Sequence, residues 1–551
     1  MQHALDMFYP EAALFLLSAA CLMAAWVRGA RLSGGFGIGR AGLLLSGWLV
    51  LFSLRADYGN IGTYIAFALL VGTWALGRAV PRRVLWGLLL LILPYHLWYG
   101  CGDLFSGIPG RLDGWSANPN IFADTLLPLV GIAGGVALFF RGIRRWAALA
   151  LCFIGLGFLV LTGSRAAIVG LIVSALLLFY LRVLRRYMAS ASVRQKTVAA
   201  VTAVVLGAGL FYGLFLLRPG SVMGRLLIYR ITAASLVQHP SGNGLVSFSH
   251  RYLPDQAAYF ERHPDSPFSL YAADTHACFN ELLQTGYELG WAGIALFILT
   301  LWYLFTLKTP GSRGLLILKV SLAGMLVASM FSYPLRSLPS AGEYAVFFAL
   351  FISYDRNRLF ALPGRKALRI VATLPALCLF VWGCLYLGRR YHAYRQFDAV
   401  CTGSVSDYQD ILDTYRTCYP ILRNEGLFLR SYAQDLSFLG ECRHSNNIYE
   451  QAVLLYLDHR MLLAMGENYE CDEDYAMAEE YYMRAHYTVP SRFRPLYKLM
   501  LLHRTLGNIT QAEIYARQIL DKRVKVPSRQ LDRMRAEAAA LLNGPTTGDS
   551  P

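Results

Sequence analysis

Long apolar runs separated by short polar segments fill the first 387 residues of the chain. An apolar run of about 20 residues is long enough to cross a bilayer as a helix. Twelve such runs lie near 10–27, 41–54, 60–77, 84–100, 121–140, 146–162, 166–181, 197–217, 289–307, 314–332, 342–354 and 370–387. The first run lacks a basic start and a small-residue cleavage site, so we expect a retained helix. The pattern predicts an all-α polytopic membrane protein with about twelve transmembrane helices.

After residue 387 the pattern becomes that of a soluble helical segment with a repeat. Positions typical of a tetratricopeptide unit are Leu462, Met465, Gly466, Tyr469, Ala478, Tyr482, Ala485 and Pro490, and a weaker copy follows 34 residues later. We predict a transmembrane domain at 1–387 with a long loop at 218–288, a tetratricopeptide-like domain at 388–543 and a disordered tail at 544–551. Such arrays usually bind peptides or proteins on a concave face. A stabilising cap on the membrane domain is the alternative.

The positive charge lies in the membrane part. The chain carries a net charge of +16, yet residues 388–551 hold 20 basic and 21 acidic residues. A nucleic-acid partner is therefore a poor explanation. Basic residues gather in alternate loops, which matches the positive-inside rule and places the 218–288 loop and both termini outside the cytoplasm. We expect a multi-pass protein of the bacterial inner membrane with both termini in the periplasm.

Four cysteines fall in the C-terminal segment that we place in this oxidising compartment. They are Cys401, Cys418, Cys442 and Cys471, and one or two disulfides are compatible with that location. The alternative, which fits the sequence equally well, is that these cysteines are free buried thiols.

Two arginines are candidates for binding a phosphate group. Arg165 lies in a short polar segment between two apolar runs, where a charged side chain costs about 2.5–3.5 kcal/mol to insert. We expect Arg225 near the start of an amphipathic helix that ends about Val237, where free backbone N–H groups also favour an anion. A guanidinium offers a planar fork of donors that suits phosphate, so the pair could clamp a diphosphate. An interfacial arginine reaching water is the alternative for Arg165, and Arg230 is the alternative to Arg225.

His276 is the candidate general base. We expect Asp274 or Thr275 to cap a helix that continues into the ninth apolar run, so that His276, Asn280 and Gln284 line one helix face. A solvated polar helix face is the alternative. The sequence contains neither a paired-histidine motif nor a glycine-rich phosphate loop with lysine. We therefore predict a reaction without metal or other cofactor.

The order of these motifs resembles the O-antigen ligase superfamily, which includes O-antigen ligases, some O-antigen polymerases and bacterial protein O-oligosaccharyltransferases. The resemblance covers about 115–350 and rests on Asn118-Pro119-Asn120, Thr162-Gly163-Ser164-Arg165, Arg225, His239-Pro240, Gly242-Asn243-Gly244, His276, Glu288-Leu289-Gly290 and Tyr333-Pro334-Leu335-Arg336. The chain departs from the family pattern at Ala277, where the family often has asparagine after the histidine.

The resemblance implies a glycan donor on undecaprenyl pyrophosphate at the periplasmic face, and an inverting transfer without nucleotide sugar or metal. Arg165 and Arg225 would bind the pyrophosphate, and His276 would accept or orient the proton of the acceptor hydroxyl. The remaining candidates for substrate binding are Ser164, Arg336, Asn120, Asn280 and Arg230.

The acceptor is the least determined partner. The tetratricopeptide-like segment slightly favours a protein hydroxyl, as in an O-oligosaccharyltransferase. A lipid A-core sugar, as in an O-antigen ligase, is a nearly equal candidate for the acceptor. A polymerase would instead use another lipid-linked repeat as the acceptor. A transporter or flippase of lipid-linked sugar is the alternative from another class, although candidate charges at one membrane face favour an enzyme. A third hypothesis is a scaffold protein, whose repeats recruit envelope proteins while the membrane part has no activity.

Overall fold

The computed structural model describes residues 36–543 except for 58–59, 106–111, 115–117, 200, 203–206, 208, 210–212, 214–218, 310, 356–359, 363–365 and 406. The described part is helical apart from one short antiparallel ladder, in which β1 (Phe36–Ile38) pairs with β2 (Phe360–Leu362). The prediction of an all-α membrane protein is confirmed. The predicted tail at 544–551 lies outside the described residues.

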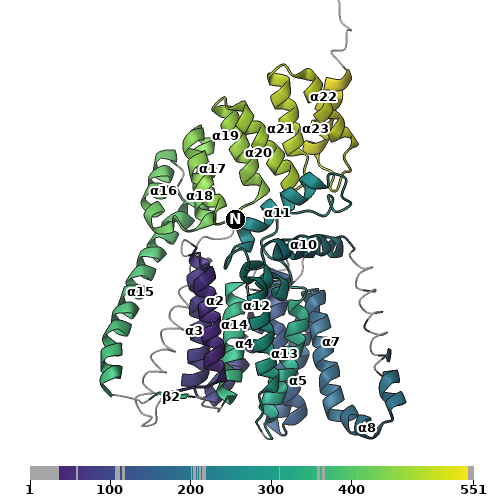
Figure 1. The fold of residues 1–551 in the computed structure, drawn as a ribbon, viewed down its shortest axis with the longest axis vertical. Helices are drawn as coiled ribbons and strands as arrows, with labels where there is room; N and C mark the ends of the chain where they lie inside the picture. Colours follow the sequence, from purple (N-terminus) through teal and green to yellow (C-terminus); the bar gives the residue numbers. More distant parts are fainter. Residues whose placement is uncertain are drawn as a thin grey trace, which may run out of the picture.

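Within the residues that the structure describes, nine apolar helices make up a bundle in the lower half of Figure 1. They are α2 (Arg40–Arg55), α3 (Ile61–Ala79), α4 (Arg82–Phe105), α5 (Pro119–Phe139), α6 (Ile143–Leu161), α7 (Arg165–Phe179), α12 (Glu281–Thr306), α13 (Arg313–Ser329) and α14 (Leu338–Tyr354). A single π-helical turn, η2 (Tyr180–Leu184), continues α7 into α8 (Arg185–Ser190). Each helix of the bundle coincides with a predicted apolar run. The first predicted run lies outside the described residues, and the eighth does so for the most part.

The bundle has the burial pattern of a protein in lipid. Helix α5 is its centre, because Phe122 through Ala133 are all buried. Helices at the outside instead expose large apolar side chains, among them Trp98 at 78% and Phe153 at 70%. Lipid tails, unlike water, solvate such side chains without penalty. Within the described residues, five helices are long and apolar enough to cross a membrane, namely α4, α5, α6, α7 with η2, and α12.

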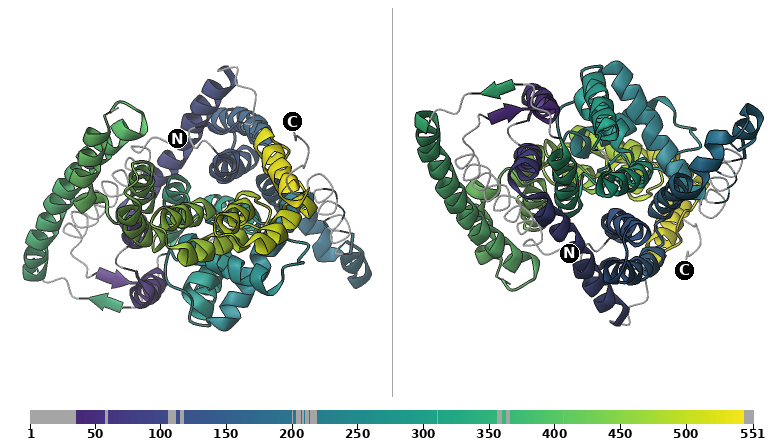
Figure 2. Two further views of the ribbon diagram at one scale, coloured as in Figure 1. Left: turned by 90° about the horizontal axis from the view of Figure 1, so that it is seen from above. Right: turned by 90° about the horizontal axis from the view of Figure 1, so that it is seen from below.

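The long loop forms a layer across one end of the bundle. Helix α10 (Pro219–Gln238) lies across the bundle axis there, and α11 (Phe248–Arg262) lies above it (Figure 1). We call this end the loop end of the bundle. Helix α15 (Lys366–Cys401) then runs alongside the bundle from β2 to the loop end (Figures 1 and 2). Its 36 residues correspond to roughly 54 Å of helix, and the predicted domain boundary at 387/388 falls inside it.

Between residues 407 and 543, all of which the structure describes, eight helices in succession form the C-terminal part above the loop layer (Figure 1). They are α16 (Tyr408–Leu422), α17 (Gly426–Phe438), α18 (Cys442–Val453), α19 (His459–Cys471), α20 (Tyr475–Thr488), α21 (Arg494–Thr505), α22 (Ile509–Asp521) and α23 (Arg529–Asn543). Ala478 of α20 and Ala512 of α22 are both fully buried where the paired helices touch. The helix pairs follow the 34-residue spacing, while the tetratricopeptide assignment itself stays a prediction.

One disulfide joins Cys442, at the start of α18, to Cys471, at the end of α19. Cys401 and Cys418 are free thiols. The bond therefore ties two successive helix pairs together, and it is one of the two outcomes that the cysteine positions allowed.

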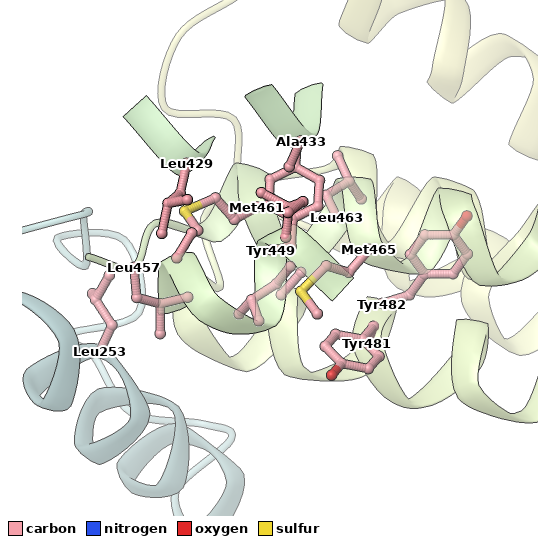
Figure 3. Packing of buried hydrophobic residues seen from close by; sticks show 14 of the residues in the cluster. Leu253, Leu429, Ala433, Tyr449, Leu457, Met461, Leu463, Met465, Tyr481 and Tyr482 are labelled. Carbon is pink, nitrogen blue, oxygen red and sulfur yellow. The ribbon is translucent and has the colours of Figure 1, made fainter. Parts of the chain in front are cut away.

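The C-terminal helices pack directly on the loop layer. Leu253 of α11 joins the apolar cluster that contains Leu457, Met461 and Leu429 (Figure 3). The side chain of Gln256, which is buried, donates to the carbonyl of Thr488 at 2.6 Å. Apolar burial and a satisfied buried amide thus fix the loop layer between the bundle and the C-terminal helices.

Candidate functional site

The loop layer is anchored where helix α12 bends. Gly290 has non-helical angles (φ 69°), so the carbonyls of Tyr287 and Glu288 lack their usual partners in the next turn. The N–H groups of Asn243 and Gly244 donate to these carbonyls at 2.8 and 2.9 Å. In return, the N–H of Trp291 donates to the carbonyl of Pro240 at 3.0 Å. We call this contact between residues 239–244 and the bend the turn–kink junction.

Glycine is required on both sides of the turn–kink junction because the two backbones touch. A Cβ atom on Gly242 would lie 2.4 Å from the carbonyl oxygen of Glu288, and one on Gly290 would lie 2.3 Å from that of Pro240. Both glycines also have positive φ, a conformation that other residues rarely adopt. The glycine motifs noted in the sequence therefore serve a close backbone contact.

Arg225 faces the bundle from helix α10. Its guanidinium lies 5.4 Å from the ring centre of Phe279, and it interacts electrostatically with Arg165, Asp124, Tyr229 and Tyr333. Burial lowers the pKa of Arg225, and the like charge of Arg165 acts in the same direction. The structure thus brings the two predicted arginines together at the loop end. Two partly buried cations that interact with each other form a favourable site for a multivalent anion.

Arg165 is the first residue of α7, and Ser164 is its N-cap residue. The backbone turns there through Gly163 (φ 63°). The Ser164 side chain is buried, and its hydroxyl has no hydrogen-bond partner among the described residues. A buried hydroxyl of this kind is uncommon and is available for a ligand atom beside Arg165.

Helix α10 begins earlier than the sequence predicts. It starts at Pro219, so Arg225 is the seventh residue of the helix rather than a residue of its first turn. The free N–H groups of a helix belong to its first four residues. The expected contribution of the helix N-terminus to anion binding at Arg225 is therefore wrong, and the positive charge there comes from the side chains.

Asp124 is a residue of this site that the sequence analysis missed. It lies in α5, is 1% exposed and accepts a hydrogen bond from the Ser332 hydroxyl. Its charge interacts with that of Arg225. An acidic residue within an apolar run is itself a signal, because its insertion is costly. Asp124 therefore places a buried carboxyl group beside Arg225.

Arg336 is held by carboxylates. Its Nη1 lies 2.8 Å from Glu288 Oε2 and its Nε lies 3.7 Å from Glu281 Oε2, and both glutamates are 1% exposed. Glu281 also accepts from the N–H of Leu335 at 2.7 Å. These contacts join the α13–α14 connection to the start of α12. They hold the guanidinium in place, and its role in substrate binding stays a prediction.

His276 lies in an irregular segment between α11 and α12, not on a helix. The cap of α12 is Asn280, whose side chain accepts from the N–H of Leu283 at 3.0 Å. The prediction that Asp274 or Thr275 caps this helix is wrong, as is the common helix face for His276, Asn280 and Gln284. An asparagine one residue before the helix competes well for the capping position, and it leaves residues 274–279 free to form the loop.

The C-terminal helices hold His276. The ring stacks on that of Tyr456 with centroids 4.4 Å apart, and its Nδ1 lies 3.3 Å from the carbonyl oxygen of Ser249. A carbonyl only accepts, so Nδ1 carries the hydrogen and Nε2 keeps its lone pair. Burial lowers the pKa of His276, against the opposing effect of Asp274. Both features suit a neutral imidazole that accepts a proton.

Phe279 connects the histidine to the arginines. Its φ of 56° is unusual for a bulky residue, and its ring contacts Tyr333 as well as Arg225. The Tyr229 hydroxyl lies 2.9 Å from the carbonyl oxygen of Phe279 and holds that peptide in place. Phe279 is three residues from His276, a span of at most about 11 Å of chain. His276 and Arg225 do not touch, but one short strained segment fixes their separation.

The remaining candidates have mainly structural contacts. Asn120 follows the α5 cap, in which the Asn118 side chain accepts from the N–H of Asn120 and donates to the Tyr333 hydroxyl at 3.0 Å. Asn280 caps α12. Arg230 is exposed and lies over the ring of Tyr259, away from Arg225.

Within the described residues, no group of three or more His, Cys, Asp or Glu side chains is arranged to hold a metal ion.

The turn–kink junction gives a direct prediction. Gly242→Ala should separate the turn from α12, because its Cβ would meet the Glu288 carbonyl at 2.4 Å. We expect faster amide hydrogen exchange at Asn243 and Gly244, measured by mass spectrometry on the purified protein. Gly87→Ala is the matched control, since its Cβ would meet no atom within 4 Å. Unchanged exchange in Gly242→Ala would contradict this account of the junction.

Comparison with known proteins finds one family in this part of the chain. Residues 148–298 match the family model described as O-Antigen ligase, and this range contains Arg165, Arg225, the turn–kink junction and His276. No curated protein matches the chain. Residues 148–298 are thus similar to the O-antigen ligase family.

Proposed function

We propose that the protein transfers a glycan from undecaprenyl pyrophosphate to an acceptor hydroxyl at the periplasmic face of the bacterial inner membrane. The family match supports a membrane glycosyltransferase of the O-antigen ligase or polymerase type. The observation that carries the finer proposal is the convergence of Arg165 and Arg225 at the loop end of the bundle. A pair of guanidinium groups there fits a diphosphate better than any neutral part of a glycan.

The two arginines act on the leaving group. As the bond between the anomeric carbon and the phosphate oxygen breaks, negative charge builds up on the pyrophosphate. Fixed cations in a site that excludes water stabilise such developing charge more than they stabilise the bound donor. Arg225 is partly buried beside the Phe279 ring, which itself contacts Tyr333, and Asp124 interacts with the guanidinium electrostatically.

His276 acts on the acceptor. Nε2 takes the proton from the acceptor hydroxyl while the hydroxyl oxygen attacks the anomeric carbon from the face opposite the phosphate. The new glycosidic bond forms with inversion, and undecaprenyl pyrophosphate leaves. Tyr456 and the Ser249 carbonyl hold the ring in the orientation that this transfer requires. No metal or other cofactor is part of this proposal.

An apolar cavity of about 330 Å³ offers space for part of the lipid chain. Side chains of α2, α3, α12, α13 and α14 line it, and Arg336, Glu281 and Glu288 lie at its polar end. A lipid that enters from the side of the bundle would thus bring its polar head toward the loop end. The membrane lipids around the bundle are the source of such a ligand.

The C-terminal helices bear on the acceptor and on the orientation. These helices hold His276 through Tyr456. Their position beside the candidate base slightly favours a protein acceptor. Lipid A-core, the acceptor of an O-antigen ligase, is a nearly equal alternative. The Cys442–Cys471 disulfide is typical of an oxidising compartment. We therefore propose that the loop end, the C-terminal helices and both termini are periplasmic.

The arginine pair is tested by substitution. Arg165→Ala and Arg225→Ala should each lower the rate of glycan transfer by about 10²–10³-fold, as loss of a fixed charge-stabilising donor does. Mass spectrometry of glycans on envelope proteins and on lipopolysaccharide, in cells that carry each variant, measures transfer and identifies the acceptor. Arg230→Ala is the matched control, being exposed on the same helix and directed at Tyr259. Near-normal transfer by both test variants would refute the clamp.

The pH dependence tests His276. Because burial lowers its pKa, the transfer rate should stay high as the pH falls through 6.5 and should decline only at lower pH, where the ring becomes protonated. Tyr456→Ala exposes the ring, so the acidic decline should move to higher pH. Tyr408→Ala is the control, because Tyr408 is 63% exposed. A profile that is the same in Tyr456→Ala and in the parent would show that His276 is not the base.

The orientation is tested with protease. A tag at the C-terminus should be cleaved in spheroplasts and protected in inside-out vesicles. A tag inserted at Gly311, in the α12–α13 connection at the opposite end of the bundle, should show the reverse pattern. Cleavage of the C-terminal tag from the cytoplasmic side would overturn the proposed orientation.

A further inference from the structure

A cavity of about 730 Å³ opens along the inner face of the C-terminal helices. Side chains of α17, α19, α21 and α23, the first helices of successive pairs, line it together with Ala272 and Ala273 of the loop layer. We call it the basic groove. Apolar side chains such as Phe438, Met461 and Phe493 form part of its wall.

The groove carries an excess of positive charge. Five cationic side chains line it against one carboxylate, Glu467; they are Arg430, Arg460, Arg492, Arg494 and Lys525. Arg430 is paired with Asp458, and Arg494 is paired with Glu467. The charges of Arg460, Arg492 and Lys525 have no carboxylate partner among the described residues, and all three side chains are exposed. Arg460 lies at the start of α19, Arg492 in the α20–α21 connection and Lys525 in the α22–α23 connection, so the unpaired charges are distributed over successive helix pairs.

The groove includes residues that are close in sequence to, or in contact with, the segment that carries the candidate base. His459, at the start of α19, lines the groove and holds the carboxylate of Asp274 through its ring and its N–H group. Asp274 is two residues before His276, and Ala273 is three residues before it. Three residues of chain span at most about 11 Å. A ligand that contacts Ala273 in the groove therefore lies against a segment whose backbone is at most about 11 Å from that of His276.

We propose that the basic groove binds an extended acidic polypeptide segment and presents its serine or threonine hydroxyl to His276. Unpaired cations and apolar side chains along one wall of the C-terminal helices match the carboxylates and apolar side chains of an extended acidic peptide. A concave face built from the first helices of successive pairs has the extended shape that a peptide fills. This inference rests on the proposed transferase function and names the acceptor class for it.

The binding experiment uses the full-length protein in detergent and a fluorescein-labelled peptide of alternating glutamate and alanine with one central serine. The change is the double substitution Arg492→Glu and Lys525→Glu, which reverses two charges of the groove. We expect fluorescence anisotropy to show about tenfold weaker binding, because two exposed ion pairs become repulsive contacts. Added salt should weaken binding to the parent protein.

The matched control is the double substitution Arg523→Glu and Arg529→Glu. These two side chains are exposed, flank Lys525 in sequence and lie outside the groove lining, so the net charge changes equally. The control should bind the peptide within about twofold of the parent. Equal weakening in both double variants would mean non-specific charge attraction and would overturn the proposal. Equal binding by the parent of a peptide with lysine in place of glutamate would overturn it as well.

Two further measurements separate the possible failures. Displacement of the labelled peptide by glucose 1-phosphate at lower concentrations than by the unlabelled peptide would assign the groove to a phosphorylated glycan and overturn the peptide inference. Arg225→Ala should lose glycan transfer yet bind the peptide normally. Peptide binding that depends on the groove, together with normal transfer by Arg225→Ala, would retain the groove and refute the proposed mechanism. Unaltered peptide binding after reversal of the groove charges, together with loss of transfer in Arg225→Ala, would overturn the peptide inference and leave the proposed mechanism in place.

Discussion

The turn–kink junction is the contact on which the candidate site depends. Helix α12 must bend at Gly290 to leave the Tyr287 and Glu288 carbonyls open, and residues 239–244 satisfy them with their own N–H groups. Helix α10, which carries Arg225, enters this turn, and the segment carrying His276 leads into the same helix α12. Unpaired backbone groups are costly at a membrane boundary, so this exchange of hydrogen bonds also keeps the loop layer against the bundle.

The candidate site divides its groups between two supports. The bundle and α10 hold the arginines, and the C-terminal helices hold His276 through Tyr456. Phe279 and the Tyr229 hydroxyl link the two supports across a short segment. Such an arrangement suits a transferase that must bind a membrane-embedded donor and a separate acceptor. It also explains why the basic groove, which would seat an acceptor, lies in the C-terminal helices and not in the bundle.

Predictions from local pattern agreed well with the structure where one strong physical effect decides. Apolar runs coincide with helices of the bundle because burial in lipid outweighs other preferences over about 20 residues. Helix boundaries were less predictable: Asn280 rather than Asp274 or Thr275 caps α12, and α10 begins at Pro219 before Arg225. Several capping residues of similar strength occur close together, and the choice among them depends on what the loop contacts. The importance of Asp124 could have been predicted, because it is an acidic residue within an apolar run. No local sequence feature indicates that Tyr456 contacts His276.

The sequence by itself determined the apolar helices, the paired C-terminal helices and the identity of the charged residues at the boundaries between runs, because these follow from hydrophobicity, periodicity and the cost of placing charge in lipid. Only the tertiary structure decided that Arg165 and Arg225 approach each other, that Arg336 is held by Glu281 and Glu288, and that His276 stacks on a residue 180 positions later in the chain. These contacts join segments that are far apart in the sequence. Their formation depends on how the kinked α12, the loop layer and the C-terminal helices pack, and no local pattern encodes that packing.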